Sequence, residues 1–341
     1  MISALQGHRD VVQALDRMID AQRIVQTILL DGPEGVGKAT LARRFAARLT
    51  GGAEKIERDD LSLAHNAAIV EEREKWPSEK RVEDPLFFSS HPDFVTFPPD
   101  GPLRQISIQQ MRLLKDRARF KPLKGSWRVF LIDHVDRAGE QAANSLLKTL
   151  EEPPEHLILV MTAENPYDLL PTIRSRAVPF HMGRLTHDEM REFAASRGLD
   201  HAERRLALAA GSPGVALSLD LEEYDKRRAA MLALLATACG EAEFGVWVKH
   251  AESIAARKSE KLESYLKVLY LLLGDILALQ YGHSELRNPD IRPALQALAA
   301  RARFEWMRRA VAKVDELMDL LRRNIQKSIA LDALVVELRS M

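Results

Sequence analysis

Cysteine is almost absent from the sequence: Cys239 is the only thiol among 341 residues. One thiol can form no intramolecular disulfide, and it cannot supply the set of thiolates that holds a structural zinc ion. Proteins of oxidising compartments often depend on disulfides, so this composition favours a reducing, cytoplasmic location. We expect the protein to bind no zinc.

Long hydrophobic runs are absent as well. The most apolar stretch, residues 268–274, is bounded by Lys267 and Asp275, and it is far shorter than the ~20 residues that cross a bilayer. The N-terminal segment MISALQGHRDVVQAL has no positively charged region followed by an apolar run. We therefore expect neither a signal peptide nor a membrane partner.

Neither charge sign is in excess, because Lys+Arg and Asp+Glu both total 49. This balance excludes a protein that holds nucleic acid by bulk charge, although it allows a local basic surface. One basic run contains a single acid, Asp116, and comprises Arg104, Arg112, Lys115, Arg117, Arg119, Lys121, Lys124 and Arg128. The run is either a solvated helix face or a surface that contacts DNA phosphates. Aromatic residues are not interleaved with it, so stacking on single-stranded bases is not expected.

Residues 1–182 alternate strand-like and helix-like segments. Short apolar runs at 27–30, 129–132 and 157–162 are typical of buried parallel strands, and helical periodicity follows each run. Ser107 and Gln110 form a capping box at the start of one helix. The pattern predicts an α/β fold, with a parallel sheet that helices cover on both faces. The polar residues 53–90 lack a clear period and indicate an insertion or a peripheral helix pair.

Strand signals end near residue 183. Thr186 with Glu189, and Asp200 with Glu203, each predict a helix start, and the Gly-Ser-Pro-Gly turn at 211–214 ends this small helical segment. From residue 222 onward the sequence is helical throughout. We therefore predict three parts: a sheet domain at 1–182, a small helical lid at 183–220 and an all-α C-terminal domain at 221–341.

A glycine-rich loop follows the first predicted strand and precedes a helix. It matches the first seven positions of the phosphate-loop pattern GxxxxGK[ST] and consists of Gly32, Pro33, Glu34, Gly35, Val36, Gly37 and Lys38. The glycines let backbone N–H groups turn inward around an anion, and the helix N-terminus and the lysine add positive charge. The alternative is a simple glycine turn before a helix. The strand–loop–helix context favours ATP or ADP as a ligand.

The phosphate loop departs from its pattern at the eighth position. Ala39 stands where a Ser or Thr hydroxyl normally holds Mg²⁺, and Thr40 lies ~100° around the helix from that position. Asp133 ends the apolar strand VFLID, in the manner of a Walker B acid that faces the shell of the metal ion. We expect nucleotide binding, with Asp133 as a weak magnesium site at most.

Three further segments carry a family resemblance: the HPD of His91–Asp93 with ISIQQMR at 106–112, NSLLKTLEEPP at 144–154 and LLPTIRSRA at 169–177. With the phosphate loop, they resemble the clamp-loader branch of the AAA+ P-loop ATPases. The resemblance covers residues 1–220 well and is weak beyond them. It implies an AAA+ domain, a lid and a C-terminal collar that closes a ring.

The resemblance also implies a function. Clamp loaders are five-subunit open rings that place the sliding clamp on primed DNA, with nucleotide held between neighbouring subunits. The implied partners are the gamma/tau motor subunits, the delta subunit, the clamp and primed DNA. Arg176, in Ser-Arg-Ala where the family has Ser-Arg-Cys, resembles an arginine finger offered to the next subunit, and Thr162 resembles the sensor of the γ-phosphate. The alternative for Arg176 is a surface arginine that caps a strand.

Departures from the family pattern indicate the kind of subunit. Active members carry a hydroxyl after the phosphate-loop lysine, a Glu after the Walker B Asp and a lid arginine; here these are Ala39, His134 and no arginine in 211–217. His134 is interpreted as a polar residue at a vacated catalytic position, although a neutral imidazole can accept a proton. The four-cysteine zinc module of many members is also missing. The combination resembles a non-hydrolysing ring stator. The alternative is an autonomous ATPase motor, while a DNA-binding initiator lacks support in residues 222–341.

Overall fold

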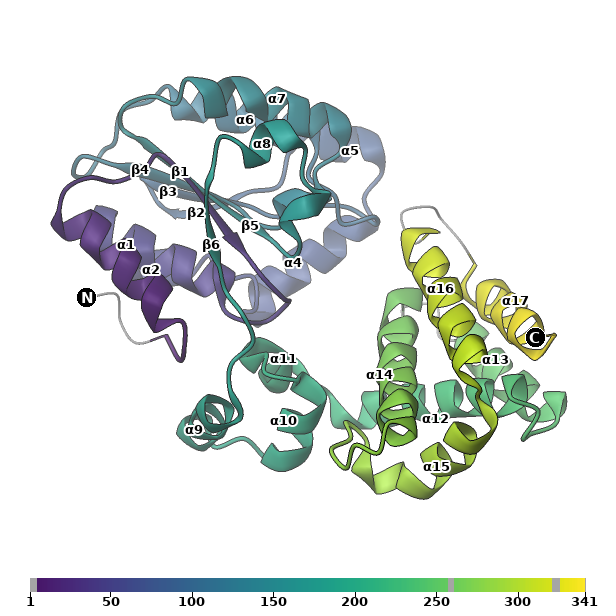
Figure 1. Cartoon of the computed structure of the whole chain (residues 1–341). Coiled ribbons are helices and arrows are strands. Elements are labelled where there is room, and N and C mark those ends of the chain that lie inside the picture. The colour runs from purple at the N-terminus through teal and green to yellow at the C-terminus, as the bar shows by residue number, and fades with distance from the viewer. Residues whose placement is uncertain (1–4, 257–260, 321–325, 341) are drawn as a thin grey trace. The chain divides into compact units, whose positions relative to one another are not determined.

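The structure is a computed structural model that describes residues 5–256, 261–320 and 326–340 (Figure 1). The chain forms two compact units. The first comprises the residues up to Gly198 together with Gly211–Val215, and the second comprises Leu199–Ala210 together with the residues from Ala216 onward. The predicted lid segment, 183–220, thus contributes to both units. The division into three domains at 182/183 and 220/221 stays a prediction.

A six-stranded sheet forms the centre of the first unit, in the order β2-β3-β4-β5-β1-β6. The strands are β1 (Thr27–Asp31), β2 (Phe88–His91), β3 (Phe94–Phe97), β4 (Arg128–Ile132), β5 (Leu157–Ala163) and β6 (Val178–His181). All neighbouring pairs are parallel except β2 with β3, which is antiparallel. The three strands expected from apolar runs are confirmed. The other three were not predicted, because they are four-residue strands, and two of them, β2 and β6, are largely exposed.

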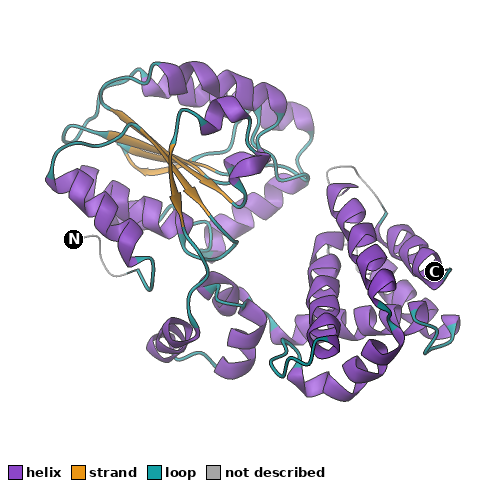
Figure 2. Cartoon of the chain, viewed as in Figure 1, coloured by secondary structure: helices purple, strands orange, loops and turns teal. Residues whose placement is uncertain are grey.

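Helices cover both faces of this sheet (Figures 1 and 2). They are α1 (Arg9–Asp20) and α2 (Lys38–Thr50) on one face, and α6 (Ile108–Ala118), α7 (Glu140–Glu151) and α8 (Pro171–Arg174) on the other. Alternate residues of each central strand enter opposite cores: Ile28 and Leu30 pack on the α2 side, whereas Leu29 packs on the α7 side. This double burial explains why the central strands read as continuous apolar runs. The predicted α/β class is confirmed.

Residues 53–90 form three short helices and most of β2. The helices are α3 (Ala53–Glu57), α4 (Ala64–Glu74) and α5 (Ser78–Glu83). Buried charges attach them to the first unit: Arg43 of α2 pairs with Glu57 and Asp60, and Arg73 of α4 pairs with Asp100 at 2.8 Å. Asp59 is buried and accepts hydrogen bonds from the Ser90 N–H at 3.0 and 3.1 Å. The segment is therefore a folded part of the first unit.

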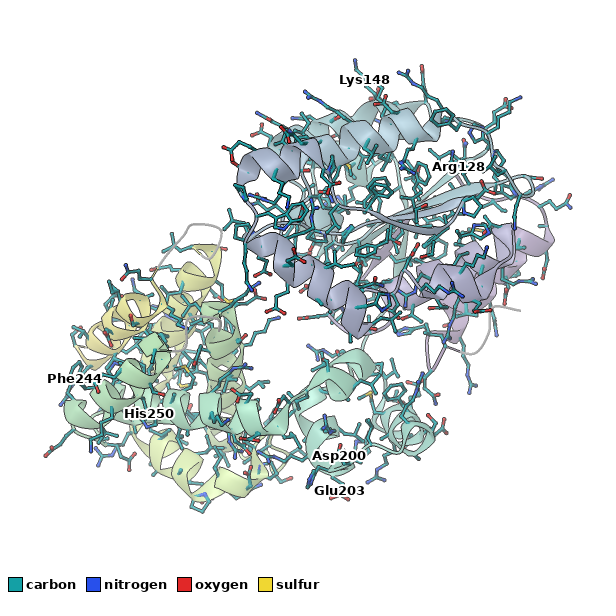
Figure 3. The ribbon with its side chains drawn as sticks, turned by 180° about the vertical axis from the view of Figure 1, so that it is seen from behind. Arg128, Lys148, Asp200, Glu203, Phe244 and His250 are labelled. Atoms are coloured by element: carbon teal, nitrogen blue, oxygen red, sulfur yellow. The ribbon has the colours of Figure 1, made fainter. Side chains whose placement is uncertain are left out.

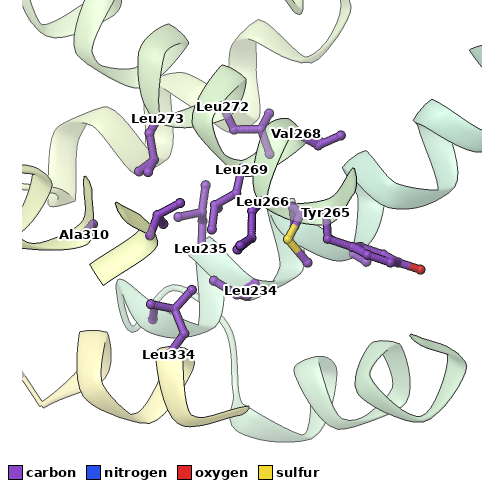
Figure 4. Packing of buried hydrophobic residues seen from close by; sticks show 14 of the residues in the cluster. Leu234, Leu235, Tyr265, Leu266, Val268, Leu269, Leu272, Leu273, Ala310 and Leu334 are labelled. Atoms are coloured by element: carbon purple, nitrogen blue, oxygen red, sulfur yellow. The ribbon is translucent and has the colours of Figure 1, made fainter. Parts of the chain in front are cut away.

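The second unit is helical. Its helices are α10 (Ala202–Ala209), α12 (Leu221–Ala238), α13 (Phe244–Ala256), α14 (Leu262–Gln280), α15 (Arg292–Arg301), α16 (Phe304–Leu320) and α17 (Lys327–Arg339). Figure 4 shows leucines of α12, α14 and α17 meeting in one apolar cluster, in which Leu234, Leu269 and Leu334 are buried. Each such side chain contributes about 1.5–3 kcal/mol by burial. The prediction of an entirely helical C-terminal part is confirmed.

Polar side chains fix the ends of several helices. The capping boxes of Ser107 with Gln110, and of Thr186 with Glu189 at the start of α9 (His187–Arg197), are present as predicted. The helix start predicted from Asp200 with Glu203 is confirmed, because α10 begins at Ala202, although Asp200 is not its N-cap. The N-cap of α10 is His201, in the left-handed conformation, and the Asp200 carboxylate instead accepts a hydrogen bond from Arg205 at 3.1 Å (Figure 3).

No helix in the described ranges has the length and apolar character needed to span a bilayer. The long apolar run of residues 268–274 lies inside α14, where Val268, Leu269, Leu272 and Leu273 are buried in the second unit. Its hydrophobicity is thus explained by packing.

Candidate functional site

The phosphate loop lies between β1 and α2, and its shape depends on close packing at two glycines. Gly32 has a φ of 145°, and a Cβ there would lie 2.0 Å from the carbonyl oxygen of Met182. Gly35 has a φ of 76°, and its Cβ would lie 2.8 Å from the Val215 nitrogen at the start of α11 (Pro213–Ser218). An L side chain at either position is excluded by both conformation and space. These glycines therefore fix the loop against its neighbours.

The carbonyl groups of this loop are occupied by protein donors. Gly214 N–H donates to the Gly35 oxygen at 2.7 Å, and His8 Nε2 lies 3.0 Å from the Val36 oxygen. Lys38 Nζ donates to the Gly32 and Pro33 oxygens at 2.6 and 2.7 Å. The loop carbonyls thus have protein partners. The N–H groups of the first turn of α2, like those of any helix start, have no intrahelical acceptors and can bind an anion.

Lys38 is buried, with 6% of its surface exposed. Burial lowers the pKa of its ammonium, and the nearby acids Glu164, Asp133, Asp136 and Glu34 act in the opposite direction. A buried cation next to helix N–H groups is suited to receive the phosphates of a nucleotide, whose charge replaces the loop carbonyls as its partner. The residues present thus fit the phosphate part of a nucleotide.

The metal part of the site fits less well. The side chain of Ala39, in the first turn of α2, offers no ligand to a metal ion, and it packs against the apolar core that α2 covers. The hydroxyl of Thr40 lies 3.5 Å from Arg43 Nη2, a guanidinium that is itself paired with Glu57 at 2.9 Å. Thr40 therefore faces the α3 side and does not replace the missing hydroxyl. Within the described residues, no group of three or more His, Cys, Asp or Glu side chains is arranged to hold a metal ion.

Asp133 and Thr162 meet at the carboxyl ends of β4 and β5. Thr162 is fully buried, and its hydroxyl donates to Asp133 Oδ1 at 2.6 Å while accepting the His134 N–H at 2.8 Å. A hydroxyl can donate one hydrogen bond, and here Thr162 donates it to Asp133. For Thr162 to sense a γ-phosphate, its hydroxyl proton must turn from Asp133 to the phosphate. The residue predicted to be the sensor, Thr162, and Asp133 are therefore coupled through one hydrogen bond.

His134 occupies a strained position immediately after Asp133. Its backbone is left-handed, with a φ of 55°, which costs a non-glycine residue energy. Its Nδ1 lies 3.7 Å from Glu164 Oε1, and Arg137 Nη2 lies 3.8 Å from the same oxygen. The imidazole is thus next to a carboxylate on the loop after β5. Glu164 is a site neighbour that sequence reasoning missed, because it follows the strand outside any quoted motif.

Arg176 follows α8 and is partly exposed. Its Nη2 donates to Glu151 Oε1 at 2.9 Å, and its Nη1 donates to the carbonyl oxygen of Thr172 at 3.0 Å. Glu151 ends α7, inside the string LEEPP that marked the family, and no sequence pattern pairs it with Arg176. The side chain of Arg176 is 34% exposed, so its guanidinium remains reachable from outside the chain.

Several members of the basic run have structural partners. Arg128, labelled in Figure 3, is buried, and its guanidinium donates to the carbonyl oxygens of Arg117 and Phe120 at 3.1 and 3.2 Å. Arg117 lies over the ring of Phe87, and Arg104 pairs with Glu74. The exposed members that remain are Arg112, Arg119, Lys121 and Lys124. The residues of the run that can contact DNA phosphates are therefore these four and the half-buried Lys115.

The HPD segment organises the loop that carries part of this run. Asp93 is fully buried, and its two carboxylate oxygens accept the N–H groups of Leu123 and Lys124 at 2.7 and 2.6 Å. His91 is buried too, and its Nδ1 accepts the Asp93 N–H at 3.2 Å. The motif thus has a structural role, which its sequence alone did not reveal.

Comparisons with known proteins agree with this architecture over both units. A family model described as "DNA polymerase III, delta subunit" matches residues 7–186, and one described as "DNA polymerase III, delta subunit, C terminal" matches residues 222–339. The delta' subunit of DNA polymerase III from Pseudomonas aeruginosa is 28% identical over 334 residues, which cover 92% of this chain and 91% of that protein.

Tau and gamma/tau subunits of DNA polymerase III are similar in sequence over a shorter region. The tau subunit of DNA polymerase III from Escherichia coli is 30% identical over 224 residues, which cover 62% of this chain but 31% of tau. The chain thus spans about a third of the length of that relative. A gamma-subunit-related protein from Thermotoga maritima is similar in structure, with a TM-score of 0.45 and 17% identity over 96% of this chain and 98% of that one.

Two adjacent family models thus account for most of the chain, the first alone for residues 7–186, and the order of sheet unit and helical unit agrees with them. The chain belongs to the DNA polymerase III delta-subunit family.

Proposed function

We propose that this chain is a clamp-loader subunit of the delta-prime type, which acts in DNA replication as the stator of a ring. In this role it hydrolyses ATP poorly or not at all and donates Arg176 to the nucleotide of a neighbouring motor subunit. Similarity to a delta' subunit over almost the whole of both proteins supports the proposal. The helical second unit then serves as the collar that holds the ring together.

One combination of residues carries the proposal: the hydrolytic groups are lost while the finger is kept. Ala39 offers no metal ligand, the Thr40 hydroxyl accepts a hydrogen bond from Arg43 instead, and His134 replaces the glutamate that orients water. Arg176, by contrast, is partly exposed and paired with the side chain of Glu151. Positioning and electrostatics dominate phosphoryl transfer, so a subunit with these losses can assist hydrolysis only at another subunit's site.

The proposed partners are the gamma/tau motor subunits, the delta subunit, the sliding clamp and primed DNA, in the cytoplasm. ATP or ADP binds at the phosphate loop, through Gly32–Lys38 and the start of α2, with little contribution from magnesium. Arg112, Arg119, Lys121 and Lys124 are candidates for contact with DNA phosphates, which would be independent of base sequence and sensitive to salt. Three domains, bounded near residues 182 and 220, follow from the same proposal.

The test is a ring assembled with motor and delta subunits and either wild-type or Arg176→Ala chain. An arginine finger contributes about 10³–10⁵ in rate at its own interface. Loss of one finger lowers total ATPase less than this, because other interfaces remain active, whereas clamp loading on primed DNA should fall sharply. Arg176→Lys should not rescue, because a point charge cannot reproduce the planar guanidinium.

Arg174→Ala is the matched control. Arg174 lies two residues away and stacks over the ring of Tyr167 at 4.9 Å, so its loss removes a similar charge without the proposed function. Ring formation, measured by the mass of the complex, should be unchanged in every variant. Normal clamp loading by a fully assembled Arg176→Ala ring would mean that the arginine has a structural role only.

The second candidate, an autonomous motor, is favoured by the intact glycine loop and by Lys38. Turnover by the isolated chain distinguishes the two. A motor turns over ATP at about 1 s⁻¹ or faster on general enzyme scales, whereas the stator remains at background.

A further inference from the structure

A pocket in the second unit lies where the end of α12, the α15–α16 junction and the end of α17 meet. Its volume is about 570 Å³. Four arginines line it, Arg301, Arg303, Arg309 and Arg339, and among the described residues Glu305 is the only acid in its lining. The lining therefore carries four positive charges against one negative charge.

Ion pairs compensate two of these four arginines, Arg301 and Arg309, and leave the other two without an acidic partner among the described residues. Glu305 forms ion pairs with two arginines, Arg308 at 2.6 Å and Arg309 at 3.2 Å. Hydrogen bonds from these guanidinium groups lower the pKa of Glu305 to about 2. Arg301 donates to the Gly240 carbonyl oxygen at 3.3 Å, and its Nε lies 3.9 Å from Glu241 Oε2. Across the described ranges, neither Arg303 nor Arg339 makes an ion pair. These two guanidinium groups can therefore bind an external anion.

The deeper lining of the pocket is apolar. Ala238, Ala302 and Leu338 are each at most 4% exposed, whereas the four arginines are exposed. Trp306 also lines the pocket, and its indole N–H is already used by the Leu338 carbonyl oxygen at 2.9 Å. Burial raises the pKa of the Cys239 thiol to about 12, so this residue adds no negative charge at neutral pH. The pocket thus combines exposed guanidinium groups with an apolar interior and one aromatic side chain.

We propose that this pocket binds a nucleoside polyphosphate, a compact ligand that carries two or more phosphate groups next to an aromatic base. Guanidinium groups bind phosphate oxygens through paired hydrogen bonds, and arginine suits this geometry better than lysine. The volume falls in the range of small-molecule sites, and apolar lining with Trp306 suits a base. The site is separate from the phosphate loop, which lies in the first unit, and it does not depend on the stator role.

The experiment measures binding to the full chain by calorimetry in about 0.15 M salt, in a Lys38→Ala background that silences the phosphate loop. The probes are ATP, inorganic tripolyphosphate and a hexaglutamate peptide. ATP should bind with a sub-millimolar Kd, tripolyphosphate should bind more weakly because it lacks a base, and hexaglutamate should bind weakest. Arg303→Ala with Arg339→Ala should weaken ATP binding at least about tenfold, since two charge-assisted contacts are lost.

Two further variants keep the test decisive. Arg308→Ala is the matched control, because Arg308 pairs with the same Glu305 from α16 but does not line the pocket; it should leave the Kd within about twofold. Glu305→Gln removes the acidic side chain from the described lining of the pocket and should tighten ATP binding. Thermal unfolding of the Arg303/Arg339 double variant should be unchanged, because neither side chain has an ion pair to lose.

Three results would overturn the proposal: no saturable ATP binding up to about 1 mM, an equal loss of affinity in Arg308→Ala, or hexaglutamate binding as tightly as tripolyphosphate. The last result would mean that the pocket responds to negative charge of any kind.

Discussion

Glu151 and Arg176 form an ion pair within one chain, with Arg176 Nη2 2.9 Å from Glu151 Oε1. The side chains are 34% exposed for Arg176 and 49% exposed for Glu151, and both come from segments that marked the family resemblance. In this conformation the proposed finger contacts its own subunit. To reach the nucleotide of a neighbour, Arg176 must exchange the carboxylate of Glu151 for a phosphate.

The first prediction is that Glu151→Gln frees the Arg176 guanidinium to contact the nucleotide of a neighbouring subunit. A solvent-exposed ion pair stabilises its geometry by at most about 1 kcal/mol, so its removal should raise the ATPase rate of the assembled ring by no more than about fivefold. Steady-state ATPase of the reconstituted complex measures this. Glu152→Gln, the adjacent and also exposed glutamate, should leave the rate unchanged. A clear decrease in Glu151→Gln would show instead that the pair orients the finger.

The second prediction concerns restoration of hydrolysis. The isolated chain should hydrolyse ATP at background, and Ala39→Ser with His134→Glu should rescue it partially at most. The structure gives a physical reason: His134 lies 3.7 Å from Glu164, so a glutamate at 134 meets a like charge that disfavours its ionised form. Adding Glu164→Gln should therefore improve the rescue. Turnover of the isolated wild-type chain near 1 s⁻¹ would contradict the stator proposal.

The third prediction concerns Asp93. Asp93→Asn leaves one oxygen where two now accept the N–H groups of Leu123 and Lys124, and it removes the charge from both hydrogen bonds. Hydrogen bonds to a charged group contribute about 1.5–3 kcal/mol each, so the free energy of unfolding should fall by about that amount. Urea unfolding measures it. Asp116→Asn, an exposed acid on α6, is the control and should change stability little; equal effects would mean that Asp93 does not anchor the loop.

The sheet and the phosphate loop followed from the sequence because their signals are local. Three buried strands appear as apolar runs, and the loop Gly32–Lys38 stands between a strand and a helix in the printed sequence. Strands β2 and β6 were missed since both are short and largely exposed, so they depend on tertiary pairing. The helix start predicted at Asp200 was placed one residue early, since the N-cap of α10 is His201 and the Asp200 carboxylate accepts a hydrogen bond from Arg205.

The contacts that define the site could not be predicted. Glu151 lies 25 positions before Arg176, and Thr162 lies 29 positions after Asp133, so each pair is created by the fold. The family resemblance supplied individual roles for Arg176 and Thr162, but it did not supply their partners. The HPD segment was noted as a family marker, and its role in anchoring a loop became clear only from the two N–H groups that Asp93 accepts.

The last prediction is that nucleotide binding depends little on magnesium. Ala39 offers no hydroxyl, and Thr40 faces Arg43 at 3.5 Å, so the ion lacks its usual ligand from the loop. Removing Mg²⁺ with EDTA should therefore change the Kd for ADP by less than about threefold, whereas Lys38→Ala should abolish binding at the loop. The measurement uses a chain that also carries Arg303→Ala and Arg339→Ala, so that the pocket of the second unit does not contribute.

Ala39→Ser supplies the missing hydroxyl and should make binding tighter with Mg²⁺ than with EDTA. Ala39→Gly is its control, since it changes the side chain without adding a ligand. If nucleotide binding by the chain that keeps Ala39 strongly required Mg²⁺, Asp133 alone would hold the ion. The explanation of the lost hydrolysis would then have to rest on His134.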